Sequence, residues 1–521
     1  MKNPSRLGRL VAAPSILALS ICGAIGGGLV FAQTSDDPEV FDAEADIAAR
    51  VKRIERLNSG SNGLNAVIVH SRIATFKARG LEGTPLQGRS VLVKDNIETE
   101  EWATTGGSLA LAANYTKRDA PLIANLRRAG GVVLGKTNLS EWANIRSDNS
   151  TSGWSAVGGL TRNPFATDRN SCGSSSGSGA AVAAGFAWGA IGTETNGSIS
   201  CPASINGVVG FKPSVGLVSR THVIPISSTQ DTAGPMTRTV KDAALLLSAI
   251  AGEDAADPVT LTAPRMADYS IGLDDASLGG VRIGVMRKQI GNRADVAQVF
   301  DVALADLERA GAVLVDIEFE PEREMFRDSF TVLMFELREG MNAYLESIPA
   351  IGGGPGETDT DIAPRSLADL IAFNKANATR EMRWFGQELF IQAEETTDRE
   401  AYEKARENAV RLAGKETLDK LLAENNVTFL IAPTRGPSWT SDLVNGDNYN
   451  GSIGFGSPAA IAGYPHLTVP MGAVEGLPVG ISFFGAKWAD YDVLKAGAAY
   501  EKARTAKLPT PSFKPWSPEG N

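Results

Sequence analysis

The most informative stretch of the chain is Gly192-Thr-Glu-Thr-Asn-Gly-Ser-Ile-Ser-Cys-Pro-Ala-Ser204, which follows a Ser/Gly run from Cys172 to Gly179. Together the two segments offer a pair of loop serines, Ser174 and Ser198. Farther upstream, Lys94 ends the strand-like run Val91-Leu-Val-Lys94. None of the three segments contains a histidine. This arrangement suggests a serine nucleophile that is activated by a lysine through a second serine.

The Ser/Gly run has two further interpretations. Ser/Gly-rich stretches are usually flexible linkers, but this one continues into Ala180–Gly185, a small-residue helix that a linker does not need. Gly173-Ser-Ser-Ser-Gly177 also satisfies G-x-S-x-G, the nucleophile elbow of α/β-hydrolases, with Ser175 as nucleophile and His222 or His466 as its base. A pattern this short arises easily by chance in a Ser/Gly run, so it does not decide the function. An α/β-hydrolase-type esterase is the alternative that it leaves open.

Lys94 is distinguished by its position. Most lysines are solvated, but this one follows the apolar residues Val91–Val93 at the end of an expected strand. Burial disfavours the charged form of an amine, so a desolvated lysine can act as a base near neutral pH. The histidines His70, His222 and His466 are otherwise interpreted as structural, because no metal or triad spacing connects them.

Alternating helical and strand-like patterns organise the rest of the chain. They predict an α/β fold, with a large mixed, mostly parallel β-sheet covered by helices on both faces. A single domain is expected over residues 33–521, with a helical insertion at about 322–426. The expected helices include Phe41–Leu57, Leu122–Ala129 after Pro121, and Val296–Ala310. The expected strands are Leu64–Val69, Val91–Val93, Val132–Leu134, Val281–Met286, Ala312–Phe319, Phe429–Pro433, His466–Pro470 and Gly480–Gly485.

The N-terminus resembles a secretory leader. Lys2, Arg6 and Arg9 precede an uncharged apolar stretch from Leu10 to Ala32, and Val30-Phe-Ala32 fits a small-x-small cleavage site. Left uncut, the stretch is long enough to span a bilayer, but proline and a glycine run make it a poor helix. Residues 1–32 are therefore predicted to be a signal peptide. The mature chain is expected to be periplasmic or secreted, without stable membrane association.

Composition limits the expected partners. The net charge of −10 disfavours nucleic acid and anionic lipid, which need clustered lysine and arginine. No CxxC or Cys/His cluster occurs, so neither a metal nor a cofactor is expected. Apart from Cys22 in the leader, Cys172 and Cys201 lie one beside each serine loop. Two cysteines do not make a disulfide framework, and we expect these two to be small packing residues.

Several motifs follow one another in order along the chain: Lys94-Asp-Asn, Gly135-Lys-Thr-Asn-Leu-Ser-Glu141, Arg162-Asn-Pro164, Cys172–Ser178, Gly192–Pro202, Gly210–Leu217 and Gly234–Val240. Ala432-Pro-Thr434, Ala462–Pro465 and Leu477–Ile481 follow toward the C-terminus. Together these motifs resemble the amidase signature family, and the resemblance covers essentially the whole mature chain. It implies the fold of that family and an enzyme that hydrolyses carboxamide C–N bonds.

The resemblance assigns a role to each matching residue. The catalytic lysine of the family falls on Lys94, its bridging serine, held next to a cis peptide, falls on Ser174, and its nucleophile falls on Ser198. The implied mechanism is a Ser-Ser-Lys triad that passes through an acyl-enzyme. In the family the oxyanion is stabilised by main-chain N–H groups of the loop that leads into the nucleophile, which here are those of Thr195, Asn196, Gly197 and Ser198.

The nucleophile loop departs from the commonest pattern of the family. Asn196 replaces the first of two glycines, and Ser200 and Cys201 stand where many members have an arginine. The missing arginine removes an anchor for an anionic acyl group, so small dicarboxylic monoamides are less expected as substrates. Ser219-Arg220 and Ile224–Asp231 are similar to the peptide amidase branch. This similarity implies C-terminal peptide amides, or other small or aryl amides, with release of ammonia or an amine.

Two other classes of protein share part of this pattern. The A subunit of glutamyl-tRNA amidotransferase has the same motifs but works with tRNA and partner subunits, and the leader and acidic charge count against it. An exported binding protein could share the α/β architecture, but it has no need for Lys94, Ser174 and Ser198 together. The expected partner is a small-molecule or peptide amide substrate, and the expected state is a monomer or homodimer.

Overall fold

The computed structural model describes residues 41–349 and 364–518. The predicted signal peptide, residues 1–32, lies outside the described residues.

The helices of the described part are α1 (Ala43–Leu57), α2 (Ala74–Lys77), α3 (Pro121–Arg128), α4 (Ser176–Ala183), α5 (Ser200–Ile205), α6 (Val240–Ile250), α7 (Ala294–Arg309), α8 (Arg323–Ser347), α9 (Leu367–Ala376), α10 (Ala378–Glu381), α11 (Glu388–Glu395), α12 (Arg399–Ala413), α13 (Lys420–Glu424), α14 (Gly456–Ala462) and α15 (Asp490–Ala503).

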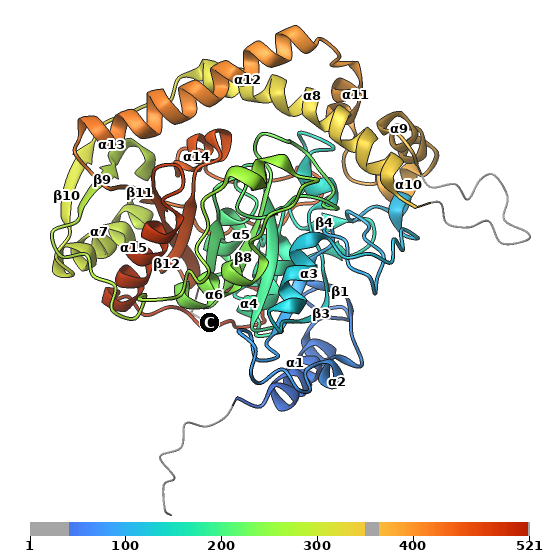
Figure 1. The fold of residues 1–521 in the computed structure, drawn as a ribbon, viewed down its shortest axis with the longest axis horizontal. Helices are drawn as coiled ribbons and strands as arrows, with labels where there is room; N and C mark the ends of the chain where they lie inside the picture. Colours follow the sequence, from blue (N-terminus) through green and yellow to red (C-terminus); the bar gives the residue numbers. More distant parts are fainter. Residues whose placement is uncertain (1–40, 350–363, 519–521) are drawn as a thin grey trace, which may run out of the picture. The chain divides into compact units, whose positions relative to one another are not determined.

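Eleven strands form one mixed sheet, which confirms the predicted α/β class with a large mixed sheet (Figure 1). In spatial order the strands are β1 (Val67–His70), β3 (Val132–Thr137), β2 (Ser90–Lys94), β6 (Gly189–Glu194), β8 (Thr232–Thr237), β7 (Val209–Lys212), β12 (His466–Val474), β13 (Leu477–Phe484), β11 (Phe429–Pro433), β9 (Arg282–Met286) and β10 (Val313–Ile317); β4 (Trp154–Ser155) and β5 (Gly159–Leu160) form a separate pair. Four of the ten strand pairs in the sheet are parallel, those of β2 with β3 and β6 and those of β9 with β10 and β11. The other six pairs are antiparallel, so parallel pairs are fewer than expected.

Helices bury both faces of the sheet. Successive side chains of a strand point to opposite faces. In β2, Val91 and Val93 therefore join an apolar cluster with α3, α6, α7 and α15, whereas Leu92 packs with α1 and α4 on the other side. A strand buried on both faces must be apolar throughout, and this explains why Val91-Leu-Val93 shows no alternation with polar residues.

The expected helices and strands recur in the structure with small shifts of their ends. Helix α3 begins at Pro121, where the missing N–H of proline is not needed in the first turn. Helix α6 begins after Thr239, whose hydroxyl accepts a hydrogen bond from the main-chain N–H of Asp242. Among the described residues, no helix is both long and apolar enough to span a bilayer.

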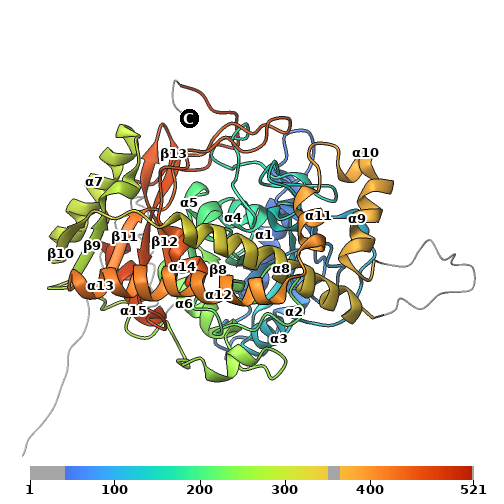
Figure 2. The ribbon, with the colours of Figure 1, turned by 90° about the horizontal axis from the view of Figure 1, so that it is seen from above.

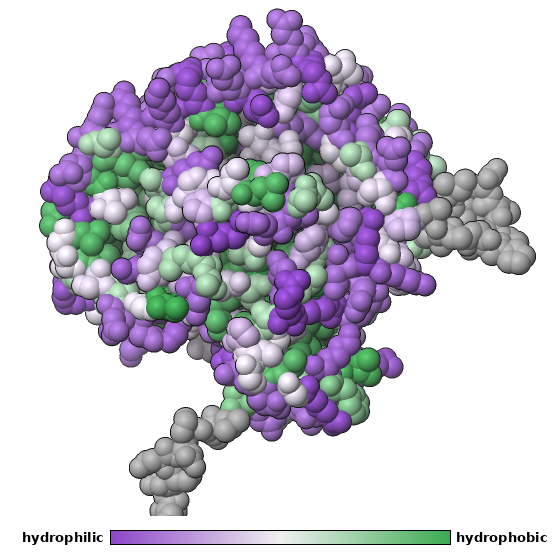
Figure 3. Space-filling model, viewed as in Figure 1, coloured by the Kyte–Doolittle hydropathy of each residue, from purple (hydrophilic) through white to green (hydrophobic). Residues whose placement is uncertain are grey.

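Between β10 and β11 the described chain contains helices and no strand. The long helices α8 and α12 of this segment lie side by side (Figures 1 and 2). Tyr402, Ala405, Ala409 and Leu412 of α12 are buried. Hydrophilic residues cover the outer surface of this region (Figure 3). Side chains from both helices reach the cavity described below.

Candidate active site

Lys94 lies at the end of β2 and is fully buried. Its Nζ is 2.8 Å from the Ser174 Oγ, 2.8 Å from the Thr193 Oγ1 and 3.3 Å from the Thr193 carbonyl oxygen. A neutral amine has two N–H donors and one lone pair. Two donors directed at Thr193 leave the lone pair for the hydroxyl of Ser174, so the three contacts fit a lysine that acts as a base.

The environment of Lys94 favours this neutral form. Burial lowers the pKa of Lys94 to about 7, although the carboxylates of Asp231 and Glu194 act in the opposite direction. At a pH somewhat above 7 most of the amine is therefore free to accept a proton. The sequence-based expectation of a desolvated lysine at the strand end agrees with this geometry.

The Ser/Gly run forms a buried loop that leads into α4. The peptide bond between Gly173 and Ser174 is cis, and Ser174 is fully buried. The neighbouring Ser175 is bound to β6: its Oγ donates to the Thr193 carbonyl at 3.1 Å and accepts from the Thr193 N–H at 3.2 Å. Ser174 therefore faces the lysine, whereas the hydroxyl of Ser175 holds the loop against the sheet.

The histidines of the α/β-hydrolase alternative do not complete a triad with Ser175. His466 Nε2 lies 2.7 Å from the Ser482 Oγ, and burial lowers the pKa of His466 to about 4. Among the hydrogen bonds of the described residues, none joins Ser175 to His222 or His466. Residues 41–349 and 364–518 also contain no group of three His, Cys, Asp or Glu residues that could hold a metal ion.

Ser198 lies in the tight loop between β6 and α5. Glu194, fully buried at the end of β6, accepts hydrogen bonds from the main-chain N–H groups of Ile199 at 2.7 Å and Ser200 at 2.9 Å. The carboxylate thereby bridges the loop that carries Thr195, Asn196, Gly197 and Ser198. Gly197 has a φ of +90°, which side-chain-bearing residues rarely adopt, and this explains the glycine.

The two serine loops are in direct contact. The main-chain N–H of Ser175 donates to the carbonyl oxygen of Ser198 at 3.1 Å. Cys172 and Cys201 form a disulfide across the same interface, with their Cα atoms 6.0 Å apart. The expectation that these cysteines are unpaired packing residues is therefore wrong. The pairing depends on how α4 and α5 approach each other, and the sequence alone does not contain that information.

Removal of this disulfide is expected to lower the free energy of unfolding by roughly 3 to 4 kcal/mol, because the bond closes a loop with a sequence separation of 29. Denaturant unfolding of the Cys172→Ala/Cys201→Ala double variant and of the wild type measures the difference. Reductant should destabilise the wild type and leave the double variant unchanged. Equal stability of the wild type with and without reductant would contradict the bond.

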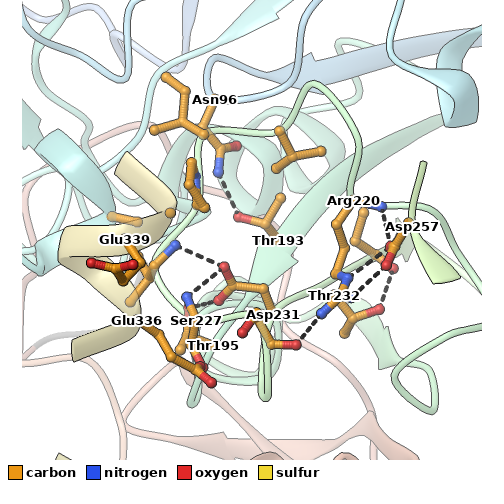
Figure 4. Close-up of a pocket in the computed structure, with 18 of the residues that line it drawn as sticks. Asn96, Thr193, Thr195, Arg220, Ser227, Asp231, Thr232, Asp257, Glu336 and Glu339 are labelled. Carbon is orange, nitrogen blue, oxygen red and sulfur yellow. Dashed lines mark hydrogen bonds and ion pairs between the residues drawn. The ribbon is translucent and has the colours of Figure 1, made fainter. Parts of the chain in front are cut away.

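Two cavities meet at this centre. The first has a volume of about 490 Å³ and is lined by Ser174 and by Thr193, which is labelled in Figure 4. The second has a volume of about 670 Å³ and is lined by Ser198, Gly197 and the disulfide. Ala143, Thr195 and Ile226 line both. A substrate can therefore lie across the serine loops with one part in each cavity.

Three residues of the site were not predicted from the sequence: Thr193, Glu194 and Asp231. Thr193 contacts the lysine, and Glu194 bridges the loop. Asp231 accepts a hydrogen bond from the Thr195 hydroxyl at 2.5 Å and from the N–H groups of Ile226 and Ser227 at 2.8 Å each. All three lie within the motifs quoted above, but without the fold nothing separates them from their neighbours.

Comparison with known proteins finds amidases that match most of the chain. The native peptide amidase from Stenotrophomonas maltophilia, a solved structure, is 44% identical with a TM-score of 0.83, and the match covers 91% of this chain and 96% of that chain. A probable amidase of Arabidopsis thaliana is 37% identical over 439 residues, which are 82% of this chain and 78% of the relative. The A subunit of the glutamyl-tRNA(Gln) amidotransferase of Halobacterium salinarum is 32% identical over 449 residues, or 84% of this chain and 100% of the relative.

The family model described as Amidase matches residues 46–494, almost the whole of the described chain. The resemblance to the amidase signature family is thus confirmed. The chain belongs to the amidase family and is a hydrolase that acts on amide C–N bonds.

Proposed function

We propose that the protein is an exported amidase that removes the C-terminal carboxamide of peptides, or hydrolyses other small or aryl amides, with a Ser198–Ser174–Lys94 triad. The contact that carries the proposal is the 2.8 Å approach of the Lys94 Nζ to the Ser174 Oγ inside a fully buried site. The loop of Ser198 lies against the loop of Ser174 and opens to a cavity.

The proposed reaction begins with proton transfer toward the lysine. Neutral Lys94 takes the proton of the Ser174 hydroxyl, while Ser174 takes the proton of the Ser198 hydroxyl. The Ser198 Oγ forms a bond to the amide carbonyl carbon, and the carbonyl π electrons move to the oxygen. The proton returns from Lys94 through Ser174 to the leaving nitrogen as the C–N bond breaks. Water then cleaves the acyl ester by the same route and regenerates Ser198.

The loop that Glu194 bridges is the proposed oxyanion hole. Its residues from Thr195 to Ser198 line the second cavity, and their main-chain N–H groups are the proposed donors. Loss of one donor of this kind typically costs on the order of 3 kcal/mol in the transition state. The donors belong to the main chain, so the proposal tolerates asparagine at position 196.

The substrate class is supported by similarity to peptide amidase. That structure is 44% identical with a TM-score of 0.83, whereas the structure of the A subunit of the Thermotoga maritima glutamyl-tRNA(Gln) amidotransferase is 26% identical with a TM-score of 0.66. An amidotransferase-like protein is the second candidate, because curated A subunits reach 33% identity over most of the chain. The acidic charge of −10 favours a peptide or small amide over tRNA.

Release of ammonia from a peptide amide tests this function. Purified protein should hydrolyse a peptide amide without partner subunits, and aryl amides and esters measured beside it define the leaving group. Activity only in the presence of partner subunits and tRNA would favour the amidotransferase candidate. If no amide released ammonia or an amine, the proposed function would be wrong.

Export is proposed from the leader and is consistent with the disulfide. Disulfides persist in oxidising compartments and are rare in the cytosol. Fractionation of cells that produce the full chain should recover the activity outside the cytoplasm, with an N-terminus close to residue 33. Activity confined to the cytoplasm would contradict export.

Substitution of Glu194 by glutamine is expected to lower kcat about tenfold, because the hydrogen bonds donated by the Ile199 and Ser200 N–H groups lose their charge assistance. The carboxylate of Glu194 also raises the pKa of Lys94. Its removal should therefore move the inflection of kcat/KM to lower pH. Asp301→Asn, on the exposed side of α7, removes the same charge and should leave the inflection in place. An unchanged or higher inflection in Glu194→Gln would refute this role.

A further inference from the structure

The first cavity has an unusual distribution of charge. Its walls include Ser227 and Asp231 of the segment that precedes β8, and Glu336 and Glu339 of α8 (Figure 4). Arg399 and Tyr402 of α12 also line it. Two of the carboxylates on its walls, Asp257 and Glu339, have arginine partners. Arg220 bonds to both carboxylate oxygens of Asp257, with Nε 2.8 Å from Oδ2 and Nη2 2.5 Å from Oδ1. Glu339 pairs with Arg338 at 2.6 Å and with Arg399 at 3.5 Å.

Two further carboxylates on the same wall have only neutral donors. Glu336, almost completely buried, accepts from the Thr229 hydroxyl at 2.6 Å, the Thr229 N–H at 3.0 Å and the Tyr402 hydroxyl at 2.7 Å, and also from Ser227. Asp231 accepts from the Thr195 hydroxyl and two main-chain N–H groups. Within the described ranges, neither carboxylate forms an ion pair with lysine or arginine. Four carboxylates and two guanidinium groups, those of Arg220 and Arg399, line the cavity, so carboxylates are in excess by two.

Aromatic rings complete this wall. Phe335 of α8 and Tyr402 of α12 are stacked with their centroids 4.2 Å apart and their planes 10° apart, and both line the cavity. The face of an aromatic ring attracts a cation, and here the Arg399 guanidinium already lies 5.2 Å from the Phe335 centroid. Arg406 lies 5.7 Å from the Tyr402 centroid, so arginines of the chain already lie over both rings. The excess of carboxylates is therefore what favours an ammonium or guanidinium group in the cavity.

We propose that the first cavity binds a cationic side chain of the substrate, so that the enzyme prefers peptide amides that carry lysine or arginine near the scissile carboxamide. This inference rests on the proposed function, because it names the substrate class of the same site. A cation in the cavity would lie near Asp231 and Glu336. A carboxylate there would face more carboxylates than guanidinium groups.

The preference is measured with three peptide amides that differ only in the side chain of the residue bearing the carboxamide: lysine, norleucine and glutamate. For the wild type, kcat/KM should fall in that order, with the lysine substrate favoured over the glutamate substrate at least about tenfold. Glu336→Gln keeps the shape of the side chain and removes its charge. In this variant the ratio of kcat/KM between the lysine and glutamate substrates should fall several-fold.

Glu324→Gln is the matched control. Glu324 lies on α8, as Glu336 does, but it lines a separate groove formed by other residues of α8 and α12. It removes the same charge and should not change the ratio.

Measurements at about 0.05 M and about 0.5 M salt separate local binding from attraction by the acidic surface, which salt screens. The inference is overturned if the ratio is near one, if it survives in Glu336→Gln, or if high salt abolishes it. If the norleucine substrate is hydrolysed but the charged substrates show no preference, this inference is wrong and the proposed function stands. If none of the three substrates is hydrolysed, the proposed function is contradicted.

Discussion

Replacement of Ser198 by alanine is expected to lower kcat for a peptide amide by about 10⁴-fold or more, because the nucleophile is removed from a set of residues that act as a unit. Ammonia release at saturating substrate measures the loss. KM should change little, because the cavity walls and the loop that Glu194 bridges keep their contacts. The surrounding fold should also stay intact, since Ser198 is linked to the neighbouring loop through its main-chain carbonyl.

Ser175→Ala is the control for this experiment. Ser175 is adjacent to Ser174, and it is the nucleophile of the α/β-hydrolase alternative. Its hydroxyl contacts only the main chain of Thr193 in the described structure, so its loss should cost far less activity than the loss of Ser198. The assignment fails if Ser198→Ala keeps the wild-type rate, or if Ser175→Ala alone abolishes activity.

Replacement of Lys94 by alanine should lower kcat/KM by roughly 10²- to 10⁴-fold, the usual contribution of general base catalysis. The pH dependence gives a sharper test. Since the pKa of Lys94 is lowered to about 7, the wild-type rate should rise as pH increases through about 7, where the amine loses its proton. Below that pH the amine has no lone pair with which to accept the proton of Ser174.

The residual activity of Lys94→Ala should lack this inflection. Lys94→Arg, which keeps a positive charge at every accessible pH, should be as impaired as the alanine variant. A wild-type profile that falls as pH rises through 7, or an inflection that survives in Lys94→Ala, would show that another group is the base.

Much of the fold could be predicted from periodicity. Runs such as Val91–Val93 and Phe429–Pro433 are apolar because helices cover both faces of the sheet, and Pro121 marks a helix start whatever the tertiary structure. The order of the strands could not be predicted. β2 lies between β3 and β6, and β13 lies between β12 and β11, so the pairing depends on contacts far apart in the sequence.

The candidate site, too, could be predicted from the sequence only in part. Lys94, Ser174 and Ser198 could be selected because lysine and serine carry their chemistry in the side chain and occur in ordered motifs. Asp231 acts through its contact with Thr195, and Glu336 through its place on a cavity wall that α12 completes. Such roles arise from packing between distant segments. The Cys172–Cys201 bond was missed for the same reason.

The most direct test of the triad is to find the acylated residue. Wild-type enzyme is quenched during turnover of an ester substrate, whose acyl group should accumulate if deacylation limits the rate, and its peptides are analysed by mass spectrometry. The acyl mass should be found on the peptide that contains Ser198, and it should be absent from Ser198→Ala. An acyl group on Ser175 or another residue, or turnover with no covalent intermediate under conditions of slow deacylation, would contradict the proposed mechanism.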